Sequence, residues 1–138
     1  MVGIVIATHG EMAKGLLDAA RSVAGHAEGS ASVCLREGDA VDSLGPRIAA
    51  AIDAVNDGDG VIVLVDMWGA SPFVAAAHLA IKAQHRIEVI AGVNLPMVLE
   101  ILVQRTAKGF EELAAVALQA GSEGIRALSQ AVADGQAW

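Results

Sequence analysis

The feature that most constrains the fold is a run of five consecutive apolar residues, Val61-Ile62-Val63-Leu64-Val65. A strand with one face in water would alternate apolar and polar residues, so an unbroken run indicates a strand that is covered on both faces. Such strands are typical of parallel sheets with helices on both sides. The run therefore predicts an α/β domain of the doubly wound class, with a mainly parallel sheet.

Similar short runs recur and alternate with longer segments that have helical spacing. The predicted strands are Val2–Ala7, Ala31–Arg36, Gly60–Asp66 and Ile87–Ala91. The predicted helices are Glu11–Ala24, Ser43–Val55, one that begins at Ser71-Pro72, Met97–Gln104 and one around Phe110–Ala120. At the start of the third helix, the serine would act as the cap and the proline would take the first helical position. Near the C-terminus Gly121 and Gly124 interrupt the helical pattern, so Ile125–Leu128 is either a short last strand or the fraying end of a helix, and we favour the strand.

Composition excludes several classes of protein. The formal net charge is −7 with only nine Lys and Arg residues, whereas nucleic-acid surfaces concentrate cations, so we expect no nucleic-acid partner. No stretch approaches the ~20 apolar residues that a membrane span needs. The chain opens directly on an apolar strand pattern, with no basic lead or cleavage site, so we expect no signal peptide and a cytoplasmic location.

Two strand ends carry side chains suited to group transfer. The first strand runs into His9 and the third into Asp66, and ligands bind at the carboxyl ends of parallel strands. If these strands are neighbours, Asp66 can accept a hydrogen bond from one ring nitrogen of His9 and leave the other free as a nucleophile. We therefore predict His9 and Asp66 as the catalytic residues.

The residues that follow Asp66 would bind the oxygens of a transferred phosphoryl group. The helix that begins at Ser71 offers backbone N–H groups and a positive dipole end, and the serine adds a hydroxyl. Gly69 and Ala70 are small and would let the loop backbone approach closely. The arrangement requires no metal, and we expect no cofactor.

Three ordered motifs support a more specific expectation. They are Gly3–Gly10 (GIVIATHG), Val63–Pro72 (VLVDMWGASP) and Val89–Met97 (VIAGVNLPM). Together they resemble the enzyme IIA component of the mannose-type (mannose, fructose, sorbose) branch of the bacterial phosphotransferase system. The resemblance implies a single IIA domain over residues 1–138 and a sheet order of 2-1-3-4. It also implies a homodimer in which the short C-terminal strand is exchanged between subunits.

The resemblance also implies an activity and partners. His9 matches the phosphorylated histidine of the family, Asp66 its hydrogen-bonding partner and Ser71 a hydroxyl beside the phosphate. The chain would then be a phosphotransferase component that carries a phosphoryl group as phosphohistidine. The donor would be the phosphocarrier HPr, and the acceptor a separate IIB protein that phosphorylates sugar during uptake through membrane permease components.

The loop after Asp66 has two further features. Trp68 is expected to be at least partly exposed there, and with Met67 it is a candidate for partner docking, although it could equally cover the local core. Ala70 stands where the family often has a second glycine. A left-handed backbone at that position would cost ~1 kcal/mol or more.

Three other interpretations remain open. A regulatory phosphoprotein would carry the same phosphohistidine without serving a sugar permease. A receiver-like domain phosphorylated on Asp66 would need carboxylates at the end of the first strand to hold magnesium, where this chain has Ala7-Thr8-His9-Gly10. A small hydrolase with Ser71 as nucleophile would show a Gly-x-Ser-x-Gly pattern, which this chain lacks.

Overall fold

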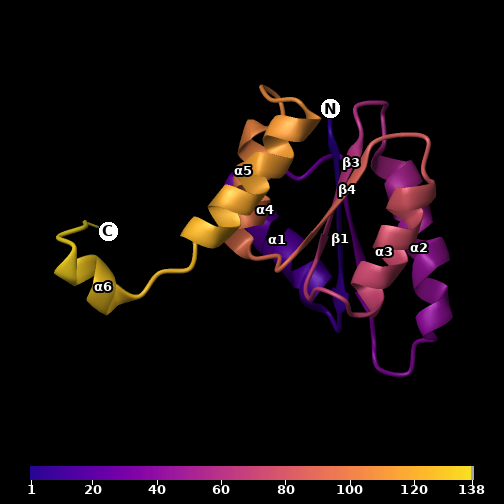
Figure 1. Cartoon of the computed structure of the whole chain (residues 1–138), viewed down its shortest axis with the longest axis horizontal. Coiled ribbons are helices and arrows are strands. Elements are labelled where there is room, and N and C mark those ends of the chain that lie inside the picture. Colours follow the sequence, from indigo (N-terminus) through magenta and orange to yellow (C-terminus); the bar gives the residue numbers. More distant parts are fainter. Residues whose placement is uncertain (138) are drawn as a thin grey trace.

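Four parallel strands form the centre of the computed structural model, which describes residues 1–137 (Figure 1). They are β1 (Gly3–His9), β2 (Ser30–Leu35), β3 (Val61–Val65) and β4 (Ile87–Ala91). Their order is β2-β1-β3-β4, and each neighbouring pair is parallel. The predicted sheet order is confirmed, and it makes the strands that precede His9 and Asp66 neighbours.

Helices cover both faces of the sheet (Figure 1). On one face lie α1 (Met12–Ala24), α4 (Leu95–Gln104) and α5 (Phe110–Glu123), and on the other lie α2 (Leu44–Val55) and α3 (Ser71–Lys82). A short 3₁₀ helix, η1 (Val41–Ser43), precedes α2, and α6 (Leu128–Ala133) follows α5. None of the helices in residues 1–137 combines the length and the apolar character needed to cross a bilayer.

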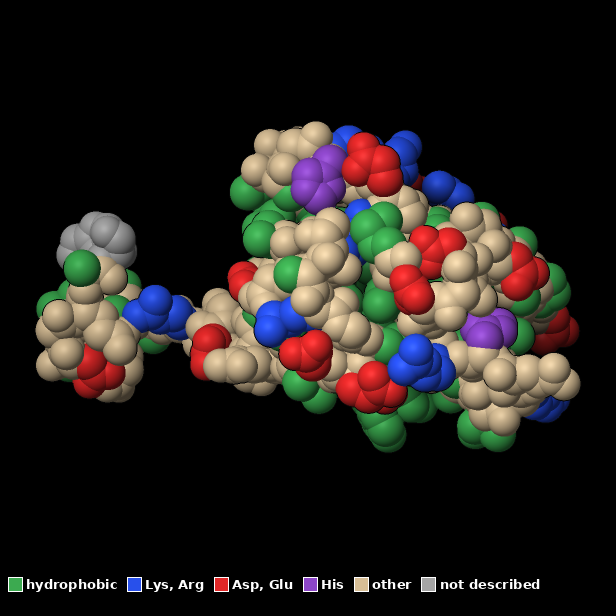
Figure 2. Space-filling view, turned by 90° about the horizontal axis from the view of Figure 1, so that it is seen from above, with side chains coloured by type: hydrophobic (Ala, Val, Ile, Leu, Met, Phe, Trp, Pro, Cys, Tyr) green, Lys and Arg blue, Asp and Glu red, His purple; other side chains and the backbone are tan. Residues whose placement is uncertain are grey.

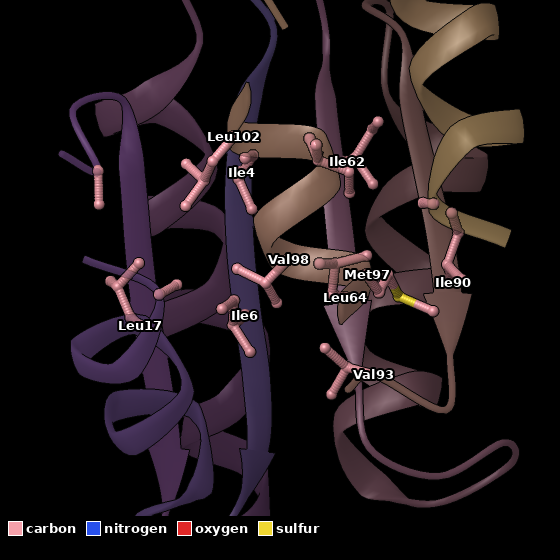
Figure 3. Close-up of a cluster of buried hydrophobic side chains, with 14 of the residues drawn as sticks. Ile4, Ile6, Leu17, Ile62, Leu64, Ile90, Val93, Met97, Val98 and Leu102 are labelled. Carbon is pink, nitrogen blue, oxygen red and sulfur yellow. The ribbon is translucent and has the colours of Figure 1, made fainter. Parts of the chain in front are cut away.

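Each strand contributes to two cores, because successive side chains point to opposite faces of a sheet. On the side of α1, α4 and α5, Ile4, Ile6, Ile62 and Leu64 pack beneath Val98 of α4 (Figure 3). The buried residues of the opposite core are Val5, Ala7, Val33, Leu44, Ile48, Ile52, Val61, Val63, Val65 and Ala76. All five residues of β3 are buried, as its unbroken apolar run predicted.

The C-terminal segment differs from the strand predicted at Ile125–Leu128. Helix α5 continues to Glu123, and Gly121 lies inside it as a buried residue. A Cβ atom at this position would come within 2.5 Å of the Met97 side chain, so the glycine allows α5 to pack closely on α4. Residues 125–127 are non-helical and lead into α6. They lead away from the sheet (Figure 1), and the C-terminal part lies apart from the rest of the molecule (Figure 2). A strand needs a hydrogen-bonding neighbour. The predicted strand is therefore wrong for the single chain.

Candidate active site

His9 and Asp66 are in direct contact at the carboxyl end of the sheet. The neighbouring strands β1 and β3 are in register up to the pair Ala7–Val65, so both residues emerge at the same edge. His9 Nδ1 lies 2.8 Å from Asp66 Oδ2, and the His9 backbone N–H donates to the same oxygen at 2.9 Å. These two contacts fix the position of the imidazole relative to β3.

Asp66 is held as an anion by this contact. Partial burial raises the pKa of its carboxyl group, but hydrogen bonds from the His9 backbone and ring outweigh that effect, and the pKa lies below its ordinary value. The second oxygen, Oδ1, accepts the Met67 N–H at 3.0 Å. An ionised carboxylate beside Nδ1 favours the tautomer with hydrogen on that nitrogen, which leaves Nε2 with a free lone pair. The His9 side chain is 45% exposed, so a partner can reach the ring.

Thr8 holds the backbone beneath His9 and was not among the residues selected from the sequence. It is fully buried, and its hydroxyl accepts the Ala13 N–H at 2.7 Å and donates to the His9 carbonyl at 3.1 Å. On the other side, the N–H of left-handed Gly10 donates to the Leu35 carbonyl at 2.7 Å. A hydroxyl residue at the end of an apolar strand, just before a helix, was the available sequence signal.

Helix α3 begins one residue earlier than predicted. Ala70 is the N-cap residue, Ser71 is the first helical residue, and no side-chain hydrogen bond caps the helix. The prediction of a Ser71 cap is wrong because the extended backbone of Ala70, with φ −81° and ψ 173°, lets its carbonyl accept the Val74 N–H at 2.9 Å. The left-handed residue in this loop is Gly69, with φ 76°. Ala70 therefore avoids the strain expected for a non-glycine residue there.

Ser71 and Gly69 make no hydrogen bond to His9 or Asp66 within residues 1–137. Both line an open cavity of about 410 Å³ with residues of η1 and α3. The phosphate-binding role predicted for these residues and for Ala70 stays a prediction.

Trp68 and Met67 are exposed beside His9 and Asp66, at 75% and 58%. The indole packs on the ring of Phe73, with 4.2 Å between ring centroids, and so rests on the first turn of α3. Together with Asp66, the two side chains line an open cavity of about 560 Å³ whose other lining residues come mainly from β4 and α5. The predicted exposure of Trp68 is confirmed, and docking stays a prediction.

This arrangement suits transfer of a group to and from one imidazole nitrogen. Asp66 orients the ring, and Nε2 is the nitrogen available for attack. The hydrolase interpretation has little support, because Ser71 is not hydrogen-bonded to His9. The receiver-like interpretation also lacks support, since Asp66 accepts hydrogen bonds from His9 and the end of β1 carries no carboxylate.

The family model described as "PTS system fructose IIA component" matches residues 3–118, which include both catalytic candidates and the whole sheet. The chain belongs to this family. The family resemblance inferred from the three motifs is thereby confirmed, and the matched residues make up the IIA domain that this family model describes.

Relatives of this IIA component are named for different sugars. The mannose-specific EIIAB component of Escherichia coli (strain K12) is 39% identical over 128 residues, which cover 92% of this chain and 39% of that protein. The sorbose-specific EIIA component of Klebsiella pneumoniae is 33% identical over 102 residues, covering 74% of this chain and 73% of that one. The crystal structure of the phosphotransferase system component EIIA from Streptococcus agalactiae superimposes with a TM-score of 0.87 at 26% identity, covering 94% of this chain and 99% of that chain. This chain therefore spans about two fifths of the mannose-specific relative.

Proposed function

We propose that this IIA component is a phosphocarrier that accepts a phosphoryl group from HPr on His9 and passes it to a IIB protein during sugar uptake. The observation that carries the proposal is the 2.8 Å contact between His9 Nδ1 and Asp66 Oδ2 at the open end of the sheet. Relatives named for the mannose and sorbose systems favour transport over a purely regulatory role.

In the proposed transfer, the Nε2 lone pair of His9 attacks the phosphorus atom held by the donor. A new N–P bond forms as the bond from phosphorus to the donor breaks, and the electron pair of that bond stays with the donor. The proton on Nδ1 remains hydrogen-bonded to Asp66, and the carboxylate stabilises the positive charge that develops on the ring. The same steps in reverse pass the group to IIB.

The loop after Asp66 would contact the oxygens of the phosphoryl group. The N-terminal turn of α3 offers backbone N–H groups and a positive dipole end, to which Ser71 adds a hydroxyl. Gly69 and Ala70 would let this backbone approach the group closely. The exposed side chains of Trp68 and Met67 would provide apolar contact area for HPr and IIB, as aromatic residues often do at interfaces.

We propose further that the protein is a homodimer in which the segment around residues 125–127 of one chain lies along the β4 edge of the other. Within the described strands, β4 pairs only with β3, so its outer edge has unpaired backbone groups. Ile125 and Leu128 are 79% and 68% exposed. Leu118, which is 56% exposed, lines the open cavity beside β4. An exchanged segment would cover these apolar side chains.

Intact-mass spectrometry tests the carrier function. The protein is incubated with phosphoenolpyruvate, enzyme I and HPr, and the expected result is a gain of one phosphoryl group that is lost in acid. His9→Ala should not gain the group and should keep its fold, because the side chain is exposed. His78→Ala, at an exposed position on α3, is the matched control and should be labelled fully.

Two outcomes would contradict this proposal. Full labelling of His9→Ala would show that another residue carries the group. No gain on the wild-type protein, with an HPr that is active on another IIA protein, would mean that this chain is not a carrier.

A further inference from the structure

Arg36 stands next to His9 at the carboxyl end of the sheet. It directly follows β2, which pairs with β1 on the side opposite to β3. Leu35 of β2 pairs with His9. The Leu35 carbonyl accepts the Gly10 N–H at 2.7 Å. Neighbouring strands lie about 4.8 Å apart and one residue advances about 3.3 Å, so the Cα atoms of Arg36 and His9 are about 6 Å apart. Arg36 and His9 therefore lie at the same edge of the sheet.

The backbone and side chain of Arg36 are both held in place. Its N–H donates to Asp39 Oδ2 at 2.9 Å, and its carbonyl accepts the Asp39 N–H at 3.0 Å. Its side-chain Nε donates to the carboxylate of Glu11, two residues beyond His9. Within residues 1–137, Nη1 and Nη2 of Arg36 have no hydrogen-bond partner. Two donors of an oriented guanidinium are thus available beside the site.

A phosphoryl group on His9 would need a cation that the catalytic pair does not supply. It would carry a charge of about −2 at neutral pH, close to the Asp66 carboxylate that contacts the same ring. The other arginine of this region, Arg47, donates to the Cys34 carbonyl and pairs with Asp39. Arg36 is therefore the arginine with free donors at this edge.

We propose that Arg36 binds the phosphoryl group carried by His9, while Glu11 holds its guanidinium in position through Nε. Nη1 and Nη2 each donate to a phosphoryl oxygen, in the two-pronged geometry that a guanidinium provides. The side chains of Arg36 and Glu11 are 52% and 58% exposed, so their ion pair contributes little to stability, and positioning is its main effect. The inference rests on the proposed phosphorylation of His9.

A ³¹P NMR titration of the phosphorylated protein tests this contact. Phosphoprotein is prepared with phosphoenolpyruvate, enzyme I and HPr, and the chemical shift of the phosphohistidine is followed against pH. Arg36→Gln should raise the midpoint of the phosphoryl titration by about half a pH unit or more, because the dianion loses a bound cation. Glu11→Gln should lower the midpoint, since the amide oxygen can still accept from Nε while the competing negative charge is gone.

A matched exposed ion pair provides the control. Arg21 pairs with Asp18 in the last turns of α1, so Arg21→Gln changes the net charge by the same amount and should leave the midpoint unchanged. The hydrogen bond between Glu11 and Arg36 lowers the pKa of the first and raises the pKa of the second. Both groups therefore stay charged while the phosphoryl group titrates.

The outcomes separate this inference from the proposed function. A wild-type phosphohistidine signal with an unmoved midpoint in Arg36→Gln would overturn the Arg36 contact alone. An equal shift in Arg21→Gln would also overturn it, since it would reflect overall charge. A weaker apparent affinity for HPr with an unchanged titration would place Arg36 in docking instead. Absence of any phosphohistidine signal in the wild-type protein would contradict the proposed function, and this inference with it.

Discussion

The carboxyl end of the sheet and the C-terminal segment differ in where their contacts come from. His9 is fixed by two hydrogen bonds to Asp66, and the buried Thr8 beneath it bonds to the start of α1. In contrast, Ile125 and Leu128 are 79% and 68% exposed, and the segment extends away from the body of the molecule (Figures 1 and 2). The geometry of the contact between His9 and Asp66 is therefore set within one chain.

The C-terminal segment lacks such support. Helix α6 has only six residues, and isolated helices shorter than about 12 residues are marginal in water. The apolar side chains of Ile125 and Leu128 are exposed to water, and their burial would be favourable in free energy. The exchange that we propose would place this segment on another surface, the outer edge of β4 in a second chain.

The largest expected effect is the loss of the proposed dimer. The double variant Ile125→Asp, Leu128→Asp places two charges where an exchanged segment would be buried, so light scattering after size exclusion should change from a dimer to a monomer. His9 should still be phosphorylated, because its contacts lie within one chain. Val23→Asp, at a 68% exposed position on α1, should remain dimeric. A monomeric wild-type protein, or a dimeric double variant, would refute the exchange.

The next effect is on the rate of transfer. Asp66→Asn keeps a hydrogen-bond acceptor but removes the charge that stabilises the cationic ring, so single-turnover transfer from HPr should slow by about 100-fold. Quenched-flow measurement of phosphoprotein formation gives this rate. Asp53→Asn, at an exposed carboxylate on α2, is the control and should transfer at the wild-type rate. An unchanged rate in Asp66→Asn would show that the proposed orienting role is wrong.

Much of the body could be predicted from the sequence, because its patterns are local. The apolar run Val61–Val65 predicted a strand buried on both faces, and all five residues are buried. The ends of two such strands indicated His9 and Asp66. Their contact followed only once β1 and β3 were neighbours, which the residues alone left open and the family resemblance implied.

The errors arose where contacts between distant elements decide the structure. Gly121 was interpreted as a helix breaker, yet it lies within α5 and packs on Met97, so the strand expected after it does not form in the single chain. Ser71 was predicted as the cap of α3, but the N-cap residue is Ala70, whose extended backbone begins the helix without a side-chain hydrogen bond. Arg36 acquires its significance only from the pairing of β2 with β1.

The smallest expected effect concerns the support of the site rather than its chemistry. Thr8→Val keeps the side-chain shape but removes the hydroxyl, and the buried Ala13 N–H loses its acceptor. Urea denaturation should therefore show a loss of about 1–3 kcal/mol in the free energy of unfolding. Thr8→Ser should lose less, since it keeps the hydroxyl, and Val23→Thr on exposed α1 should change stability by less than about 0.5 kcal/mol. If Thr8→Val is as stable as the wild-type protein, the hydroxyl does not hold β1 to α1, and the site is less firmly supported than its hydrogen bonds indicate.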